Sequence, residues 1–268
     1  MKKCFILFAK NLFFLLPGTA QQFVYGLYLK LLLRNRHIPD CTVYKDALRG
    51  KYGLEVGGPS FIFRSILPVY LVIEKLDGVN YSNLTKWEGS ISEGINYSWY
   101  WGKKGRQFIS ECTDLGSIND STYQFLISSN CLEHTANPIK ALEEWVRVIQ
   151  PGGYILLVLP KKDNNYDNKR PTTKFSHLID DYKCGIGEGD TTHVEEVLNL
   201  HDLTKDPHAG SFEVFKKTIL SNFTNREMHH HVFDVSLIKQ IFKYLKIELL
   251  HFDSIDSDYI FLGKTKNH

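Results

Sequence analysis

A run of six apolar residues near the middle of the chain, Tyr154 to Leu159, most restricts the possible fold. A continuous apolar run of this length is typical of a strand buried on both faces. It follows Pro151-Gly152-Gly153 directly, and before that turn apolar side chains recur at helical spacing between Asn137 and Val148. Asn137-Pro138 supplies a helix cap and a first-turn proline. This helix, turn and strand together indicate a sheet covered by helices on both faces.

The same alternation extends over most of the chain. From Tyr52 onward, short apolar runs alternate with helical patterns, which predicts an α/β fold with a mostly parallel sheet. After Pro160 the alternation is lost for about 70 residues, too long for a simple loop. A helix over Val235–Leu245 then resumes it, and two terminal strands are expected to form an antiparallel edge. The predicted strands are Tyr52–Val56, Gly78–Tyr81, Gln107–Glu111, Tyr123–Ser128, Tyr154–Leu159, Ile247–Phe252 and Asp258–Gly263.

We expect three parts along the chain: an amino-terminal helical segment over 1–48, a main domain over 49–268, and an inserted subdomain over 161–231 within that domain. The apolar stretches Cys4–Leu16 and Phe23–Leu33 are too short for a membrane span, which takes about 20 apolar residues. Lys10 also splits the first stretch, and no convincing cleavage site follows, which disfavours a signal peptide. Two interpretations stay open: helices packed on the main domain, or a helix pair over residues 4–33 in peripheral contact with a membrane.

Charge and cysteine content exclude several classes of protein. The formal net charge is only +2, with 43% hydrophobic and 23% charged residues, whereas proteins that bind a phosphate backbone are usually strongly basic. Nucleic acid is therefore not an expected partner. The five cysteines are scattered and never spaced as C-x-x-C, so neither a disulfide framework nor a zinc–cysteine site is expected. A cytoplasmic protein fits this pattern; the sequence does not indicate an oligomeric state.

Four motifs follow the predicted strands in order. The first strand runs into Gly57-Gly58, and glycine lets a nucleotide approach the backbone closely. Further along come Cys112-Thr113-Asp114-Leu115, then Ser129-Asn130-Cys131-Leu132-Glu133-His134, then Trp145 to Tyr154 with its Pro-Gly-Gly turn. In order and spacing, this series resembles the motifs of class I S-adenosylmethionine-dependent methyltransferases. The resemblance covers roughly residues 52–160, and its most specific part is the Leu-Glu-His segment together with the Pro-Gly-Gly turn.

The resemblance implies a Rossmann-like, seven-stranded sheet and S-adenosyl-L-methionine as cofactor. It also implies roles for individual residues. Glu55, Gly57 and Gly58 would face the methionine end and ribose of the cofactor, Asp114 would accept a hydrogen bond from the adenine, and Leu115 would pack near that ring. Ser129 and Asn130 would line the methyl-donating side. For Glu55 a purely structural role, satisfied by backbone donors, stays open.

One position departs from the family pattern. Where the family places an acidic residue at the end of the second strand to hold the ribose, this chain has Asn80. An amide still bonds a hydroxyl, but without the strength that a carboxylate's charge provides. Asp77 or Glu88 could compensate for that loss.

Histidines are the candidate catalytic groups. Methyl transfer rests largely on alignment of donor and acceptor, and a base is needed only for a hydroxyl or protonated amine. His134 is placed by its motif either as that base or as a cap of the following helix. The predicted insertion adds His193, Glu196 and the triplet His229-His230-His231 among many acidic residues. Acid–base work or substrate contact, a metal site, and solvated surface all stay open there; we expect His230 and His231 to be catalytic and no metal to be bound.

The acceptor is not encoded in the motifs. We expect a small molecule or a glycan precursor of the cell envelope, held under the insertion. Two other classes remain as alternatives: a domain that binds the cofactor or a partner without catalysis, and a nicotinamide-dependent oxidoreductase. The absence of a third glycine after Gly57-Gly58 disfavours the oxidoreductase, since a dinucleotide requires close helix packing.

Overall fold

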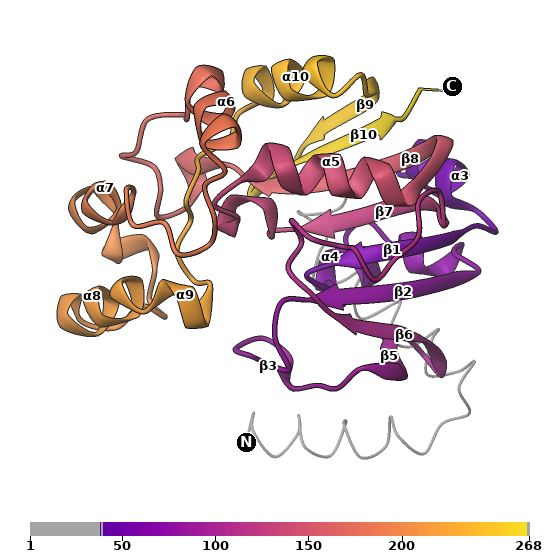
Figure 1. The fold of residues 1–268 in the computed structure, drawn as a ribbon, viewed down its shortest axis with the longest axis horizontal. Coiled ribbons are helices and arrows are strands. Elements are labelled where there is room, and N and C mark those ends of the chain that lie inside the picture. Colours follow the sequence, from indigo (N-terminus) through magenta and orange to yellow (C-terminus); the bar gives the residue numbers. More distant parts are fainter. Residues whose placement is uncertain (1–37, 39, 267–268) are drawn as a thin grey trace, which may run out of the picture.

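In the computed structural model, which describes residue 38 and residues 40–266, a single large sheet forms the centre of the molecule. Its strand order is β5-β6-β2-β1-β7-β8-β10-β9. The central strands pair in parallel, β1 with β2 and β7, β2 with β6, and β7 with β8. Figure 1 shows helices on both faces of this sheet. The predicted α/β fold with a mostly parallel sheet is confirmed.

The described chain begins with α3 (Thr42–Leu48) and β1 (Tyr52–Val56). Its remaining elements up to the end of the long central strand are α4 (Phe61–Arg64), the 3-10 turn η1 (Val69–Leu71), β2 (Lys75–Asn80), β3 (Leu84–Thr85), β4 (Gly89–Ser90), β5 (Gly94–Tyr100), β6 (Lys103–Ile109), β7 (Tyr123–Ser129), η2 (Leu132–His134), α5 (Pro138–Val148) and β8 (Ile149–Pro160).

Residues 161–231, for which only an insertion was expected, contain mainly short helices. After this segment the chain forms α10 and its two last strands. These elements are η3 (Lys162–Asn164), α6 (Phe175–Cys184), α7 (Val194–Leu200), η4 (Leu203–Lys205), α8 (Phe212–Leu220), α9 (Asn222–Asn225), α10 (Val235–Tyr244), β9 (Glu248–Ser254) and β10 (Asp258–Lys264). In Figure 1, α7, α8 and α9 lie beyond the arrowheads of the central strands.

Within residues 40–266 the sheet has eight strands rather than the seven expected. The additional strand is β5, which pairs antiparallel with β6 and forms one edge. At the other edge, β9 and β10 are antiparallel to each other as predicted. The outermost strand there is β9, however, because β10 lies between β8 and β9 and is antiparallel to both. The chain therefore returns from the edge to pair with the centre of the sheet.

Alternate residues of the central strands enter two separate cores. Along β8, Ile155, Leu157 and Leu159 pack with α5, α6 and α10, whereas Leu156 and Val158 pack with α3, α4 and η1 on the opposite face. This alternation follows from the period of two in a strand, and it explains why the run from Tyr154 to Leu159 is apolar without interruption. Burial of this strand on both faces is confirmed.

The helix before the Pro-Gly-Gly turn begins as its sequence predicts. Asn137 caps it by accepting a hydrogen bond from the backbone N–H of Lys140 at 3.1 Å, and Pro138 lies in the first turn. Trp145 on its buried face is fully enclosed and donates from Nε1 to the Cys112 carbonyl at 3.0 Å. That bond ties α5 to the loop after β6.

The predicted membrane-contacting stretch at residues 4–33 lies outside the described residues. Among the helices that are described, none has the length and apolar character needed to cross a membrane.

Candidate active site

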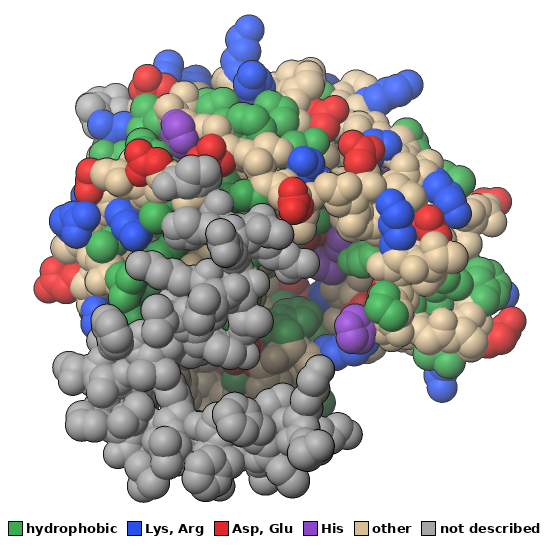
Figure 2. Space-filling view, turned by 180° about the vertical axis from the view of Figure 1, so that it is seen from behind, with side chains coloured by type: hydrophobic (Ala, Val, Ile, Leu, Met, Phe, Trp, Pro, Cys, Tyr) green, Lys and Arg blue, Asp and Glu red, His purple; other side chains and the backbone are tan. Residues whose placement is uncertain are grey.

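A cavity of about 700 Å³ opens at the carboxyl ends of the parallel strands. Val56 and Gly57 reach it from β1, Asn80 from β2 and Ser129 from β7. Ligands of open α/β sheets bind at this edge, and the volume lies within the range of small-molecule sites. The opposite wall comes from the segment 161–231. Viewed from behind, Figure 2 shows a hollow with histidine side chains beside it. The residues on that wall are Tyr166, Glu188, Asp206, His208, Arg226 and Glu227.

The turn after β1 requires glycine at two successive positions. Gly57 has a φ of +80°, and a Cβ there would lie 3.0 Å from Cys131. A Cβ on Gly58 would lie 2.2 Å from the carboxyl carbon of Glu55 and 2.5 Å from the hydroxyl of Tyr97. Gly57 lines the cavity. Gly58 does not line it, because it packs against the side chains of Glu55 and Tyr97 inside the turn.

Glu55 stabilises this turn from inside the protein. Its side chain is fully buried and accepts hydrogen bonds from the hydroxyls of Tyr70 (2.5 Å) and Tyr97 (2.7 Å) and from the Ser60 backbone N–H (2.9 Å). Burial raises the pKa of the Glu55 carboxyl, although these donors oppose the rise. The carboxylate therefore holds the glycine turn in shape and does not line the cavity, which favours the structural role left open for it.

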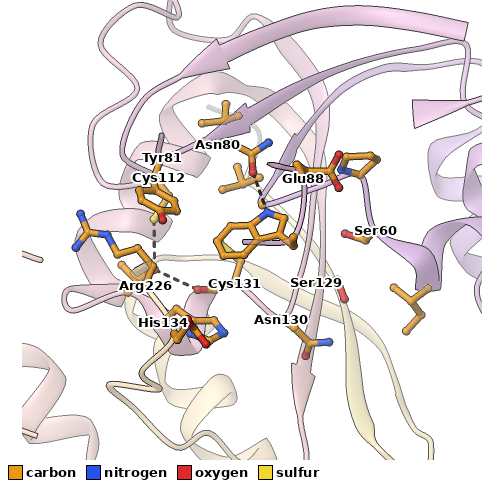
Figure 3. A pocket seen from close by; sticks show the side chains of 18 of the residues that line it. Ser60, Asn80, Tyr81, Glu88, Cys112, Ser129, Asn130, Cys131, His134 and Arg226 are labelled. Carbon is orange, nitrogen blue, oxygen red and sulfur yellow. Dashed lines mark hydrogen bonds between the residues drawn. The ribbon is translucent and has the colours of Figure 1, made fainter. Parts of the chain in front are cut away.

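Asn80 lines the cavity, but both ends of its amide are engaged within the protein. Nδ2 donates to the Gly58 carbonyl at 3.0 Å, and Oδ1 accepts from Nε1 of Trp87 at 3.3 Å (Figure 3). Of the two acids suggested as compensation, Glu88 lines the cavity. Asp77 does not, because it is buried farther back in β2 and bonded to Tyr123.

In the loop after β6, the residues that line the cavity come two to three positions before Asp114, the first residue expected there. Glu111 and Cys112 line it. Asp114 is exposed and accepts from the Gly116 N–H at 3.1 Å, and Leu115 is fully buried in the core against α5. The adenine contacts expected of Asp114 and Leu115 are therefore not supported by their positions.

Ser129 and Asn130 lie at the end of β7 and point toward the cavity (Figure 3). Asn130 has a φ of +49°, and its N–H donates to the Val158 carbonyl at 3.1 Å. Asparagine tolerates this left-handed backbone better than most residues. The strand thus ends in a sharp turn at the position expected for the methyl-donating side.

His134 is the one of the three predicted catalytic histidines that lines the cavity. Its Nδ1 lies 3.2 Å from the Met228 carbonyl, so that nitrogen carries the proton and Nε2 keeps a free lone pair. Burial, and then the neighbouring His229, lower the pKa of His134 to about 3. The imidazole is therefore neutral at pH 7 and keeps the lone pair on Nε2, although burial makes it a weaker base than a free imidazole.

His230 and His231 lie elsewhere. Both side chains are almost fully buried and neither lines the cavity. Nε2 of His230 lies 3.1 Å from Nδ2 of Asn222, and Nε2 of His231 lies 3.1 Å from the Ala136 carbonyl. Direct contact of these two histidines with a substrate is not compatible with this burial.

The first histidine of the triplet lies in a different chain of hydrogen bonds. Nδ1 of His229 is 2.5 Å from Asp167, and its Nε2 is 2.8 Å from the hydroxyl of Tyr166, which lines the cavity. Burial lowers the pKa of His229, but the Asp167 carboxylate outweighs burial and raises it overall. Arg170 holds the other oxygen of Asp167 at 2.8 Å. This arrangement fixes the Tyr166 hydroxyl at the cavity wall.

Arg226 joins the segment 161–231 to the sheet. Its side chain is 7% exposed; it bonds the Glu111 carboxylate and donates to the Glu188 carbonyl at 3.2 Å. Its guanidinium also lies 5.3 Å from the ring of Tyr81 (Figure 3). Burial raises the pKa of Glu188 to about 7, although Arg226 opposes the rise. No local sequence pattern marks this residue, because its partners come from three separate segments.

Comparison with known proteins supports the methyltransferase that the sequence motifs predict. Residues 98–157 match the family model of a methyltransferase domain. Among proteins with curated descriptions, none matches this sequence. On the family match, the predicted S-adenosylmethionine-dependent methyltransferase is confirmed.

Solved structures with a similar arrangement are distant in sequence. A methyltransferase from Aquifex aeolicus shares 15% identity over 89% of this chain and 97% of its own, with a TM-score of 0.47. One from Thermotoga maritima shares 14% identity over 88% and 93%, with a TM-score of 0.46. The 1,6-didemethyltoxoflavin-N1-methyltransferase of Burkholderia thailandensis shares 8% over 85% and 78%, with a TM-score of 0.47.

Proposed function

We propose that this methyltransferase transfers a methyl group from S-adenosylmethionine to a hydroxyl or amino group of a small polar acceptor, bound between the strand ends and the segment 161–231. The observation that carries the proposal is the double lining of the cavity, from the strand ends on one side and from the segment 161–231 on the other. One wall would hold the cofactor, and the other would cover the acceptor.

The strand-end wall fits the cofactor chemically. Gly57 lines the cavity, and glycine has no side chain of its own to keep a ligand away from its backbone. Glu88 and Glu111 offer carboxylates to hydroxyl and amino groups, and apolar Ile62 and Val79 line the same wall. Ser129 and Asn130 would lie closest to the site of transfer.

When bound, S-adenosylmethionine would supply an activated methyl group: the acceptor's oxygen or nitrogen would bond to the methyl carbon as the carbon–sulfur bond breaks, and S-adenosylhomocysteine would leave. The protein contributes alignment and exclusion of water. We assign proton removal to Nε2 of His134, since that nitrogen carries the lone pair and the ring lines the cavity. The Tyr166 hydroxyl, held by His229, positions the acceptor through a hydrogen bond.

The acceptor wall is polar and carries both signs of charge. Asp206 and Glu227 provide acceptors for hydroxyl groups, and Arg226 and His208 provide donors. A hydroxylated small molecule such as a glycan precursor is matched by such a wall, because its hydroxyl groups can both donate to these carboxylates and accept from these donors.

The test has two stages with the full chain. Calorimetric titration with S-adenosylhomocysteine measures cofactor binding, and radiolabelled S-adenosylmethionine then reports transfer to a panel of hydroxylated and amino acceptors. Binding together with transfer to a polar small molecule supports the proposal. Binding without transfer to any acceptor would favour a cofactor-binding domain without catalysis, and stabilisation by NAD(H) but not by S-adenosylhomocysteine would overturn the assignment.

A further inference from the structure

Four side chains of the segment 161–231 converge at one point outside the cavity: His177, Asp181, His193 and His231. One ligand atom from each lies within 4.8 Å of the ligand atoms of the others. None of the four lines the cavity described above. We propose that they form a zinc site that fixes the fold of this segment, although the sequence led us to expect no metal.

The distances fit tetrahedral coordination. Nε2 of His177 lies 3.1 Å from Nε2 of His193 and 3.2 Å from Oδ2 of Asp181. The same oxygen lies 3.8 Å from Nε2 of His231. Ligands that surround zinc tetrahedrally at about 2 Å lie about 3.3 Å from one another, and histidine nitrogen and carboxylate oxygen are both zinc ligands.

One ligand atom at this point lacks a hydrogen-bond partner, which is unusual for a buried group. Oδ2 of Asp181 is buried and makes no hydrogen bond with any described residue, and the side chain of His231 beside it is fully enclosed. Buried polar atoms in native proteins nearly always have a partner, and a bound ion is one explanation for an exception. Nε2 of His231 also lies 3.1 Å from the Ala136 carbonyl, so metal binding would displace the proton that this nitrogen shares with the carbonyl.

A second group, Glu133, His134 and His229, also lies close together. It is a weaker candidate because both ring nitrogens of His229 are already bonded, to Asp167 and to Tyr166. Nδ1 of His134 is likewise within hydrogen-bond distance of the Met228 carbonyl. The comparison favours the four-residue cluster.

The ligands come from three places in the segment, which defines what the ion would do. His177 and Asp181 are one turn apart on α6, His193 precedes α7, and His231 precedes α10. Four protein ligands leave no open position for a substrate, which is the arrangement of structural zinc sites. Zinc would therefore fasten α6 and the start of α7 to the chain beside the cavity.

The experiment measures metal directly in the full chain. Protein stripped with a chelator is titrated with Zn²⁺ by calorimetry, and Co²⁺ is substituted to record the absorption of a tetrahedral centre. We expect one ion per chain, a higher melting temperature with Zn²⁺, and a loss of at least about 100-fold in affinity in His177→Gln, because even residues behind the ligands cost 10–100-fold when changed. The matched control is His251→Gln: both histidines have side chains 40% exposed, with Nε2 3.2 Å from one aspartate.

Asp181→Asn provides a second variant with the same shape as the wild-type side chain, in case His177→Gln does not fold. Its stability without metal should match that of the stripped wild type, with Zn²⁺ affinity reduced by a similar factor. Equal Zn²⁺ binding by wild type and by either folded variant would overturn the site, as would a Co²⁺ spectrum without tetrahedral features. Neither outcome depends on methyl transfer.

Discussion

Gly57 is the residue at which backbone geometry and ligand access depend most directly on the absence of a side chain. We expect Gly57→Ala to weaken S-adenosylhomocysteine binding at least about tenfold, because its Cβ would contact Cys131 at 3.0 Å at the cavity wall and a φ of +80° is strained for alanine. Calorimetry gives the affinity, and urea unfolding gives the stability.

Gly102→Ala is the control for that strain. Gly102 also has a positive φ, +67°, but a Cβ there would meet nothing within 4 Å. Both variants should lose about 1–2 kcal/mol of stability from the left-handed backbone. Equal cofactor affinity in the two variants would show that the turn does not contact the cofactor.

His134 is the residue to which we assign proton removal. His134→Gln should lower kcat by about 10²- to 10⁴-fold, the range typical of a lost general base, and leave S-adenosylhomocysteine affinity unchanged. His208→Gln, which changes another histidine of the cavity wall, should have a much smaller effect on kcat. Turnover in His134→Gln close to that of wild type would remove His134 from the mechanism and direct attention to Tyr166.

Among the elements, the contact between the sheet and the segment 161–231 includes one buried cation, Arg226. Arg226→Met should destabilise the protein by about 2–3 kcal/mol, because it leaves the carboxylates of Glu111 and Glu188 without their shared partner. Arg49→Met is the control: Arg49 pairs with Asp46 on the surface, where its side chain is 59% exposed, and such pairs contribute at most about 1 kcal/mol. Urea unfolding of both variants decides the matter, and equal losses would contradict the role of Arg226.

Two of the predicted strands, β7 and β8, share a property that β5 lacks. Tyr123–Ser129 and β8 are buried on both faces, so their apolar runs are visible without neighbours. The strand β5 is an edge strand in which exposed Ile95 and Asn96 precede buried Tyr97. Such a pattern, polar on one side and interrupted at its start, gives no clear strand signal. The hydroxyl of Tyr97 bonds the carboxylate of Glu55, which lies 42 residues away in the chain.

Only those parts of the candidate site that are formed by local turns of the backbone could be predicted from the sequence. The Gly57 turn and the Ser129-Asn130 turn are set by neighbouring residues, and both line the cavity. Glu111 and Arg226 meet across 115 positions of the chain. His230 and His231 were expected in the catalytic site, but their side chains are buried inside the protein. Contacts of this range are set by tertiary packing, which a single sequence does not display.

On the scale of the whole molecule, the segment 161–231 brings a dense group of titratable side chains against the sheet. Stability will therefore depend on pH through the groups that change pKa on folding. His134 is packed against His229 and lies near His230 and Asp167, and burial lowers its pKa to about 3. In the unfolded chain a histidine titrates near 6.5.

The sign of this dependence follows from the lowered pKa. The contribution of His134 is fully present above about pH 6.5 and is lost as the pH falls, because only the unfolded chain then takes up the proton. Between pH 7.5 and pH 5 the loss is about 1–2 kcal/mol. Glu188, whose pKa is raised to about 7, acts in the opposite direction, so the wild-type curve alone does not isolate the histidine.

The difference between two variants does isolate it. His134→Gln cannot titrate, so its free energy of unfolding should fall by about 1–2 kcal/mol less than that of wild type between pH 7.5 and pH 5. His251→Gln, on the edge strand β9, serves as the control for the chemical change itself. Parallel curves for wild type and His134→Gln would mean that His134 takes up the proton equally well in the folded and the unfolded chain, and that its packing against His229 does not lower its pKa.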